Sequence, residues 1–340
     1  MGGRALKNAY TRRISREEFE KSSIELLDAL NETFARTAIP RFFQSKETFG
    51  DIDIIVSLEG YEGNVREYIE NTFEPTEIFH NGNAYSFDYA EAQIDLIMVR
   101  GEDFDSNFHY LAFNDLGNFI GRMAQVMGLK YGQEGLWYNH YTNGNQKTKI
   151  MISKDYPKIF DYMGLDYNKW IEGFDSLEEI FEYVKTSRFF NPEIFQMYHL
   201  NKINRERNAK RASYIAFLEY IEGEDCNKDY NKLEVESHKE NLIKLIDESF
   251  PESNIRLEVK RLEYETAKSD YATCKFNGHL VMEKYGLEGK ELGDAIKSFR
   301  EYHQQGNAFT KTDDYIEFIV NESEATIWQS FERINGLYIK

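Results

Sequence analysis

Cysteine and long apolar runs are scarce in this chain of 340 residues. Its two cysteines, Cys226 and Cys274, lie far apart and form no C-x-x-C motif, which argues against a zinc site and favours a reducing compartment. No apolar run approaches the ~20 residues of a membrane-spanning helix, and the first residues lack the apolar segment of a signal peptide. We therefore expect a cytoplasmic protein with no membrane partner.

Positive charge is also in short supply, because 41 Lys and Arg residues stand against 59 Asp and Glu residues and give a formal net charge of −18. Such a protein is not a general binder of polyanions, so it must meet any nucleic acid with a local basic patch. Proline is rare as well, and the five prolines mark no linker. The aromatic content of 15% indicates a substantial core and argues against disorder.

Two aspartates stand two residues apart within a strongly apolar stretch, TFGDIDIIVS at 48–57. Its β-branched residues predict a buried strand, in which Asp51 and Asp53 point to the same face. Adjacent carboxylates repel one another unless a cation joins them, and Mg²⁺ prefers such oxygen ligands. Asp95 occurs in a matching stretch, AQIDLIMV at 92–99, and a neighbouring strand would bring it to the same metal site. The alternative is that Asp51 opens the strand as a turn residue and that Asp53 forms a local cap.

Strand and helix patterns alternate in the first half of the chain, whereas the second half is mainly helical. Ser15-Arg-Glu-Glu18 is a capping box that opens a helix ending before Pro40. The patterns predict an α+β fold, in which a mixed sheet flanked by helices is followed by a mostly α-helical C-terminal region. We expect strands at 51–57 and 92–99, hairpins at 78–80 with 84–89 and at 136–141 with 149–153, and helices at 64–73, 106–127, 155–163, 176–184, 201–221, 234–249, 255–267, 277–285, 290–303 and 313–334.

A resemblance to a known family rests on residues 46–56, KETFGDIDIIV, which look like the signature of DNA polymerase β-like nucleotidyltransferases. The likeness covers residues 15–185, and its overall pattern resembles proteins often encoded by bacteriophages, which would act in the host cytoplasm. Further segments resemble the part of family X polymerases that follows the third aspartate, and the closing helices of that family. These segments are FHYLAFNDLG at 108–117, GLKYGQEGL at 128–136 with Arg122 before it, IFDYMGL at 159–165 and LEEIF at 177–181.

The resemblance implies a two-metal enzyme that uses an NTP and whose catalytic residues are Asp51, Asp53 and Asp95. Asp51 and Asp53 would hold both Mg²⁺ ions, with Mn²⁺ able to substitute. Asp95 would ligate the second ion and accept the proton of the attacking hydroxyl. The expected organisation is a palm-like nucleotidyltransferase domain at 1–150, a helical, thumb-like domain at 151–230 and a helical C-terminal domain at 231–340.

The family's phosphate-binding motif is missing from this sequence. A Gly-Ser or Gly-Gly pair stands upstream of the aspartates in the family, whereas a Pro-Arg pair ending at Arg41 occupies that register here. We expect Arg41, Ser45 or Lys46 to contact the triphosphate instead, with Arg122 or backbone amides near Gly50 as a second option. The alternative for the two loop cations is that they are solvated.

The family's Phe-Thr-Gly-Ser turn, which holds the sugar and base, is also replaced, here by FNDL at 113–116. Phe113 is predicted to stack on the nucleoside and Asn114 to bind a ribose hydroxyl. The alternative is that Phe113 belongs to the core. Arg122 lies on the helix that follows, where it would point at the triphosphate or form a salt bridge with an acidic residue.

Positive charge gathers in one segment, NRERNAKR at 204–211. On a continuous helix over 201–221, three of these cations would share one face, and such a stripe can hold a phosphate backbone. The alternative is a solvated helix face bridged to neighbouring glutamates. The side chains that we expect to bind nucleic acid are Arg188, Arg207, Lys210 and Arg211.

Residues 277–296, NGHLVMEKYGLEGKELGDAI, resemble the helix pair in the C-terminal half of tRNA CCA-adding enzymes and bacterial poly(A) polymerases. As pure structure they form a helical hairpin with glycines at the turn. With the basic segment, this resemblance favours template-independent addition of an NMP to an RNA 3′-OH, with tRNA as one candidate. The alternatives are a family X-like DNA polymerase, an enzyme that nucleotidylates a protein or small molecule, and a catalytically inactive binding module.

Overall fold

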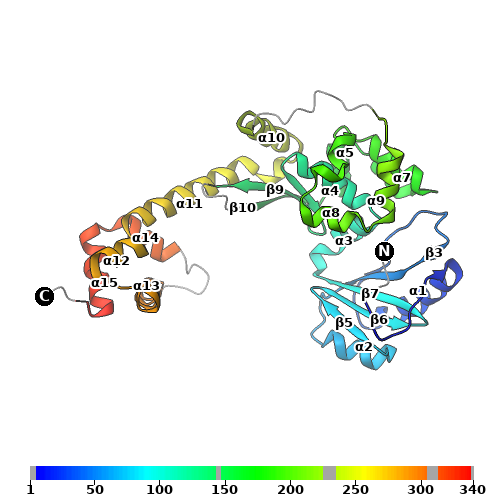
Figure 1. Cartoon of the computed structure of the whole chain (residues 1–340), viewed down its shortest axis with the longest axis horizontal. Coiled ribbons are helices and arrows are strands. Elements are labelled where there is room, and N and C mark those ends of the chain that lie inside the picture. Colours follow the sequence, from blue (N-terminus) through cyan, green and yellow to red (C-terminus); the bar gives the residue numbers. More distant parts are fainter. Residues whose placement is uncertain (1–4, 143–146, 225–234, 305–312, 338–340) are drawn as a thin grey trace. The chain divides into compact units, whose positions relative to one another are not determined.

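A five-stranded mixed sheet carries both acidic stretches in the computed structural model, which describes residues 5–142, 147–224, 235–304 and 313–337 (Figure 1). The central strands β4 (Asp51–Ser57) and β7 (Ala92–Val99) run parallel. Their neighbours pair antiparallel, so the strand order is β2-β4-β7-β6-β5. The outer strands are β2 (Thr37–Ala38), β6 (Ala84–Tyr89) and β5 (Ile78–Asn81). The predicted α+β fold with a mixed sheet is confirmed.

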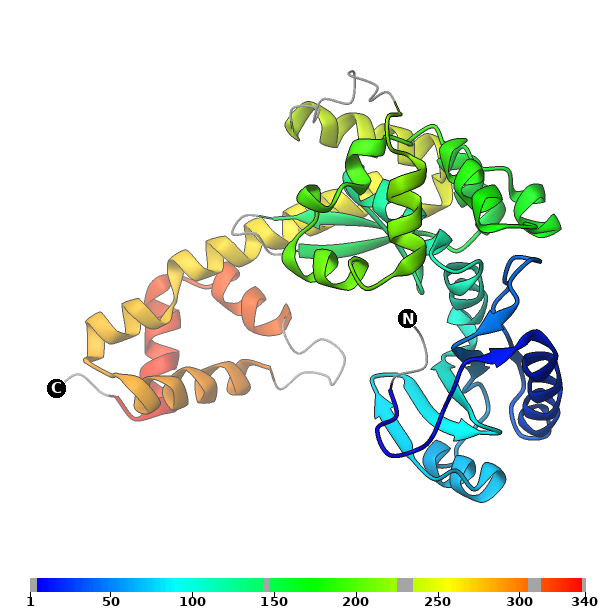
Figure 2. The same ribbon diagram turned by 45° about the vertical axis from the view of Figure 1, so that its right-hand side comes forward.

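The alternation of side chains along β4 and β7 gives the two faces of the sheet different roles. The isoleucines at 52 and 54 and their counterparts on β7 lie in a core covered by α1 (Arg16–Asn31) and α2 (Val65–Phe73). Both helices lie against this one face in two views (Figure 1, Figure 2). On the opposite face, Ile55, Ile97 and Val99 pack under α3 (Phe104–Leu111). The three aspartates lie on that second face, toward the start of both strands.

The capping box at the start of α1 is formed as predicted. The Ser15 hydroxyl accepts a hydrogen bond from the Glu18 amide, and the Glu18 carboxylate accepts one from the Ser15 amide. Ser15 also belongs to β1 (Ile14–Ser15), which pairs antiparallel with β3 (Thr48–Phe49) directly before the acidic strand. The start of α1 is therefore fixed beside the start of β4.

The predicted helix over 106–127 is wrong in one respect, because the structure has two helices there, α3 and α4 (Leu116–Val126). Phe113 and Asn114 form the turn between them, with φ of 58° and 59°. Gly117 lets the chain double back closely, since a Cβ at this position would lie 2.0 Å from the Tyr110 carbonyl oxygen. The turn therefore depends on two left-handed residues and one glycine.

The predicted helix over 201–221 is also wrong. It divides into α8 (Lys202–Asn208) and α9 (Ala212–Tyr220), because Arg211 is extended, with φ −101° and ψ 109°. The Arg211 guanidinium pairs with the buried Asp115 carboxylate, which also accepts a hydrogen bond from the Ser213 hydroxyl. Arg207, Lys210 and Arg211 consequently do not share one helical face. The tertiary ion pair overrides the helical pattern.

The rest of this part of the chain consists of a three-stranded sheet and short helices packed around aromatic side chains. Phe119, Phe181, Phe195 and Phe217 lie in contact with one another at its centre. The remaining elements are β8 (Leu129–Gly132), β9 (Gly135–Tyr141), β10 (Lys147–Ser153), α5 (Tyr156–Met163), α6 (Tyr167–Glu172), α7 (Leu177–Lys185), α10 (Val235–Ser249) and the 3-10 turns η1 (Gly101–Asp103), η2 (Pro192–Phe195), η3 (Met197–His199) and η4 (Pro251–Ser253).

The end of the chain is helical, as predicted. A core that includes Phe276, Phe299 and Phe331 joins its helices. The expected helix pair is present, and its turn uses Gly286 and Gly289, whose φ values of 69° and 54° favour glycine. The last predicted helix is interrupted where Ser323 caps a new one. These helices are α11 (Ile255–Lys275), α12 (Gly278–Tyr285), α13 (Gly289–His303), α14 (Asp313–Asn321) and α15 (Glu324–Asn335).

Two compact units divide the chain. The first comprises Met1–Asn139 and Lys149–Ile255, and the second comprises His140–Thr148 and Arg256–Lys340. The expected boundaries near 150 and 230 stay a prediction, because compactness alone does not delimit a folding domain. Cys226 and the expected start of a helix at 234 lie outside the described residues. In the described ranges, none of the helices combines the length and apolar character that crossing a bilayer requires.

Candidate metal centre

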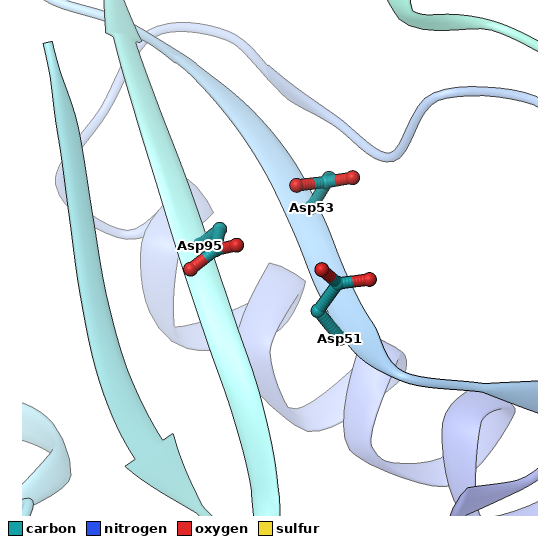
Figure 3. Close-up of side chains that lie close together, drawn as sticks. All are labelled: Asp51, Asp53 and Asp95. Carbon is teal, nitrogen blue, oxygen red and sulfur yellow. The ribbon is translucent and has the colours of Figure 1, made fainter. Parts of the chain in front are cut away.

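The three predicted aspartates converge in the first half of the two parallel strands. Asp53 lies directly beside Asp95 in the β4–β7 pairing, and Asp51 lies beside Gln93. One carboxylate oxygen from each aspartate lies within 4.8 Å of the others. Figure 3 shows the three side chains on the same side of the two strands. The predicted convergence on adjacent strands is confirmed, and this group could hold a metal ion.

The electrostatics of the aspartates favour a bound cation. Burial, and then the charges of Asp51 and Asp95, raise the pKa of Asp53 well above its usual range, while Lys46 opposes the shift. Burial also raises the pKa of Asp95, and hydrogen bonds from Ser86 and Gln93 act in the other direction. Three carboxylates so close together resist full ionisation unless positive charge is added. Because all three donors are oxygens, the donor set fits a hard divalent ion such as Mg²⁺ or Mn²⁺.

Lys46 supplies positive charge beside the aspartates. Burial lowers its pKa, whereas the charges of Asp51 and Asp53 raise it. Its ammonium nitrogen lies 4.5 Å from the ring centroid of Phe49, which comes two residues before Asp51. The structure therefore places this predicted triphosphate ligand in the field of the acidic group. Gly50 stands between β3 and β4 at the start of the acidic strand.

Arg41 and Ser45 belong to a contact between two loops. The Arg41 guanidinium donates to the carbonyl oxygens of Trp170 at 2.7 Å and Glu172 at 3.4 Å. The Ser45 amide donates to the Asp175 carbonyl oxygen at 2.8 Å, and the Ser45 side chain is exposed. These hydrogen bonds thus hold residues 41–45 against residues 170–175. Triphosphate binding by Arg41 or Ser45 stays a prediction.

Phe113 is covered in this structure, because its side chain is 1% exposed and its ring packs edge-on against Trp170 and Phe174. The neighbouring Asn114 is exposed. Arg122 donates to the Ile194 carbonyl oxygen at 2.6 Å and to the Gln125 side chain at 2.7 Å. The structure thus gives Phe113 and Arg122 packing roles, and their contacts with a nucleotide stay predictions.

The predicted nucleic-acid ligands occupy different surroundings. The Arg188 guanidinium carbon lies 4.9 Å from the ring centroid of Tyr162. Arg211 is held by Asp115. Arg207 and Lys210, by contrast, are exposed on and just after α8. The structure does not gather all four residues into one stripe.

A different basic surface surrounds α8. Its cations Lys202, Arg205, Arg207 and Lys210 are all exposed, and within the described residues only Lys202 forms a salt bridge, to Glu206 at 3.9 Å. Two apolar side chains lie near them in sequence, Tyr198 with 65% exposure and Ile203 with 77%. We call these six residues the α8 surface. Arg205 was missed because a continuous helix would have placed it on another face.

Sequence reasoning also missed the residues that surround the aspartates. Gln93 and Ser86 contact Asp95, and the strand alternation that identified Asp95 would also have placed Gln93 on its face. Arg13 was missed as well. Its guanidinium donates to the Thr48 carbonyl and hydroxyl oxygens at 2.9 Å, and its charge lowers the pKa of Lys46. No local motif marks Arg13, because it reaches the site through the pairing of β1 with β3.

Comparison of the sequence with protein-family models and with curated proteins found no match. The likeness to polymerase β-like nucleotidyltransferases therefore stays a prediction.

Proposed function

We propose that this protein is a metal-dependent nucleotidyltransferase, which moves an NMP from an NTP to a hydroxyl group of an acceptor. The observation that carries the proposal is the meeting of Asp51, Asp53 and Asp95 on two adjacent parallel strands. Carboxylates in this arrangement support two-metal phosphoryl and nucleotidyl transfer. The polymerase β-like identity of the sheet domain is part of this proposal.

The three carboxylates have distinct roles in the proposed reaction. Asp51 and Asp53 would hold both ions, and Asp95 would ligate the second ion and accept the proton of the attacking hydroxyl. When bound, two Mg²⁺ ions supply charge neutralisation on the triphosphate and a lower pKa for the acceptor hydroxyl. Lys46, in the field of Asp51 and Asp53, contributes a fixed cation toward the triphosphate. The hydroxyl oxygen forms a bond to the α-phosphorus, and pyrophosphate leaves.

The acceptor that we propose is the 3′ end of an RNA, with tRNA as one candidate. In a chain of net charge −18, the α8 surface presents four exposed cations close together. Its exposed Tyr198 offers a ring on which an unpaired base can stack. A phosphate backbone with unpaired bases matches this combination of charge and aromatic surface. The α8 surface lies in the same compact unit as the three aspartates.

The proposal is tested with the purified chain, Mg²⁺ and each labelled NTP or dNTP. The acceptors are tRNA lacking its 3′ end, single-stranded DNA and gapped duplex DNA. We expect labelled RNA with a ribonucleotide, and no label with Asp53→Asn. Labelled DNA alone would indicate a DNA polymerase, and labelled protein alone would indicate a protein-modifying enzyme. Either result would reject the RNA acceptor, and no label in any arm would reject the proposed activity.

A further inference from the structure

Asp95 is held by two polar side chains of its own sheet. The Gln93 amide nitrogen lies 2.9 Å from one carboxylate oxygen of Asp95 and 3.0 Å from the other. Ser86, the direct partner of Asp95 on β6, also hydrogen-bonds to it. Gln93 is only 2% exposed, so water does not compete freely for its amide group. The orientation of the Asp95 carboxylate is therefore set by neighbours as well as by its own backbone.

The other end of the Gln93 side chain reaches the N-terminal segment. Its amide oxygen accepts a hydrogen bond from the Ala5 backbone amide at 2.8 Å. A glutamine amide has one acceptor oxygen and one donor nitrogen, and each has a matching partner here. Rotating the amide by half a turn would place its oxygen against the Asp95 carboxylate and its NH₂ against the Ala5 N–H. The contact with Ala5 therefore fixes Gln93 in the orientation that serves Asp95.

The N-terminal segment is held in place by contacts that do not involve the three aspartates of the metal centre. The Glu77 carboxylate accepts hydrogen bonds from three consecutive backbone amides, those of residues 7, 8 and 9, at 3.0, 2.6 and 2.9 Å. Arg12 then forms salt bridges with Glu18 at 2.6 Å and with Glu91 at 2.7 Å. Hydrogen bonds and salt bridges thus hold the segment 5–13 at several positions. The Ala5 amide belongs to this held segment.

We propose that Gln93 is a positioning residue of the metal centre and that the N-terminal segment acts on this centre through it. The inference rests on the proposed metal-dependent function. Gln93 orients Asp95 without adding charge, which suits a site that already gathers three carboxylates. A carboxylate at position 93 would add repulsion, and an apolar side chain would remove the contact that Gln93 makes and leave the one from Ser86. Removing a residue that hydrogen-bonds to a metal ligand typically lowers metal affinity by about 10–100-fold.

The test measures Mn²⁺ binding to the full chain from the electron paramagnetic resonance signal of the free ion, without nucleotide. Gln93→Leu approximately keeps the size of the side chain and removes its hydrogen bonds to Asp95 and Ala5, so we expect about tenfold weaker binding. Ala5→Pro removes the amide hydrogen that faces Gln93 and fixes φ at this position, and we expect a loss of about threefold, below the range for a direct partner. Ala5→Gly keeps that hydrogen and is the matched control, expected to bind as the unaltered chain does.

The outcomes separate this inference from the metal centre itself. If the unaltered chain binds no Mn²⁺, both the metal centre and the role of Gln93 are rejected. If the unaltered chain binds Mn²⁺ and Gln93→Leu binds it equally well, the positioning role alone is rejected. If Ala5→Pro matches Ala5→Gly, the N-terminal segment has no part in the centre. Because Ala5→Pro alters no side chain of the sheet, it tests the part of the N-terminal segment even where Gln93→Leu folds poorly.

Discussion

Two groups of shielded aspartates in this molecule differ in how their negative charge is balanced. Asp115 is 6% exposed and has its partners built in, because the Arg211 guanidinium and the Ser213 hydroxyl both contact its carboxylate. Asp53 and Asp95 lie close together with Asp51, and neither forms a salt bridge with a described residue. The charge of Asp115 is balanced by its own cation, whereas three aspartates share the neighbouring Lys46, and a cation from outside would balance the rest of their charge.

Asp103 belongs with Asp115 in this comparison. Although burial acts to raise its pKa, hydrogen bonds from Lys154 and Arg100 hold the pKa of Asp103 below its usual value. The pKa of Asp53 moves in the opposite direction, since burial and its acidic neighbours act together. The pKa shifts of Asp103 and Asp53 therefore have opposite signs, as expected for a carboxylate paired with cations and for one gathered with other acids.

The largest effect is expected from Asp53→Asn. The substitution removes one charged ligand and almost no volume, so transfer of labelled nucleotide should fall by about 1,000-fold or more, as for loss of a group that acts on the reacting atoms. Thermal unfolding followed by circular dichroism should show a fold at least as stable as the unaltered protein, because repulsion is relieved. Substantial activity in Asp53→Asn would contradict the assigned role.

Asp115→Asn should have the reverse profile. Removing this carboxylate leaves the Arg211 guanidinium without its partner at the junction of α8 and α9, and we expect about 3 kcal/mol less stability in urea unfolding. Mn²⁺ affinity of the folded fraction should not change. A stable Asp115→Asn variant would show that this aspartate is not the built-in pair on which the comparison relies.

The α8 surface gives the next effect in size. Arg205→Ala with Arg207→Ala should weaken binding of single-stranded RNA by about tenfold at low salt and reduce the slope of log affinity against log salt by about 2. Lys21→Ala with Lys244→Ala removes the same charge from other exposed positions and is the matched control. Equal losses in both pairs would mean that net charge, rather than this surface, governs RNA binding.

The smallest effect concerns pH. Because the pKa of Asp53 is raised on folding, the folded chain retains a proton that the unfolded chain releases above about pH 4. Stability of the metal-free protein should therefore fall as pH rises from about 4 toward the raised pKa of this group. Urea unfolding over this range should show a shallower dependence for Asp53→Asn. Mg²⁺ should stabilise the unaltered chain most at the upper end of this pH range. The same pH dependence of stability in the unaltered chain and in Asp53→Asn would contradict the raised pKa of Asp53.

The sequence predicted the features of this fold that local pattern governs. Strands β4 and β7 follow from their β-branched, alternating residues, and the convergence of the aspartates follows from that alternation once the strands are neighbours. The break between α8 and α9 could not be predicted, because it depends on Asp115, which lies 96 residues from Arg211 in the chain. The contact of Ala5 with Gln93 spans 88 residues and leaves no local pattern either. Long-range polar contacts thus account for these two misses, whereas the break between α3 and α4 lies at the local left-handed turn of Phe113 and Asn114.

The central claim is that Asp51, Asp53 and Asp95 form a centre for divalent ions, and calorimetric titration of Mn²⁺ into the unaltered chain and into Asp53→Asn tests it most directly. The account predicts saturable binding to the unaltered chain that is competed by Mg²⁺ and is lost, or weakened at least about tenfold, in Asp53→Asn. Equal binding of Mn²⁺ by the two proteins, or no binding by the unaltered chain, would contradict it.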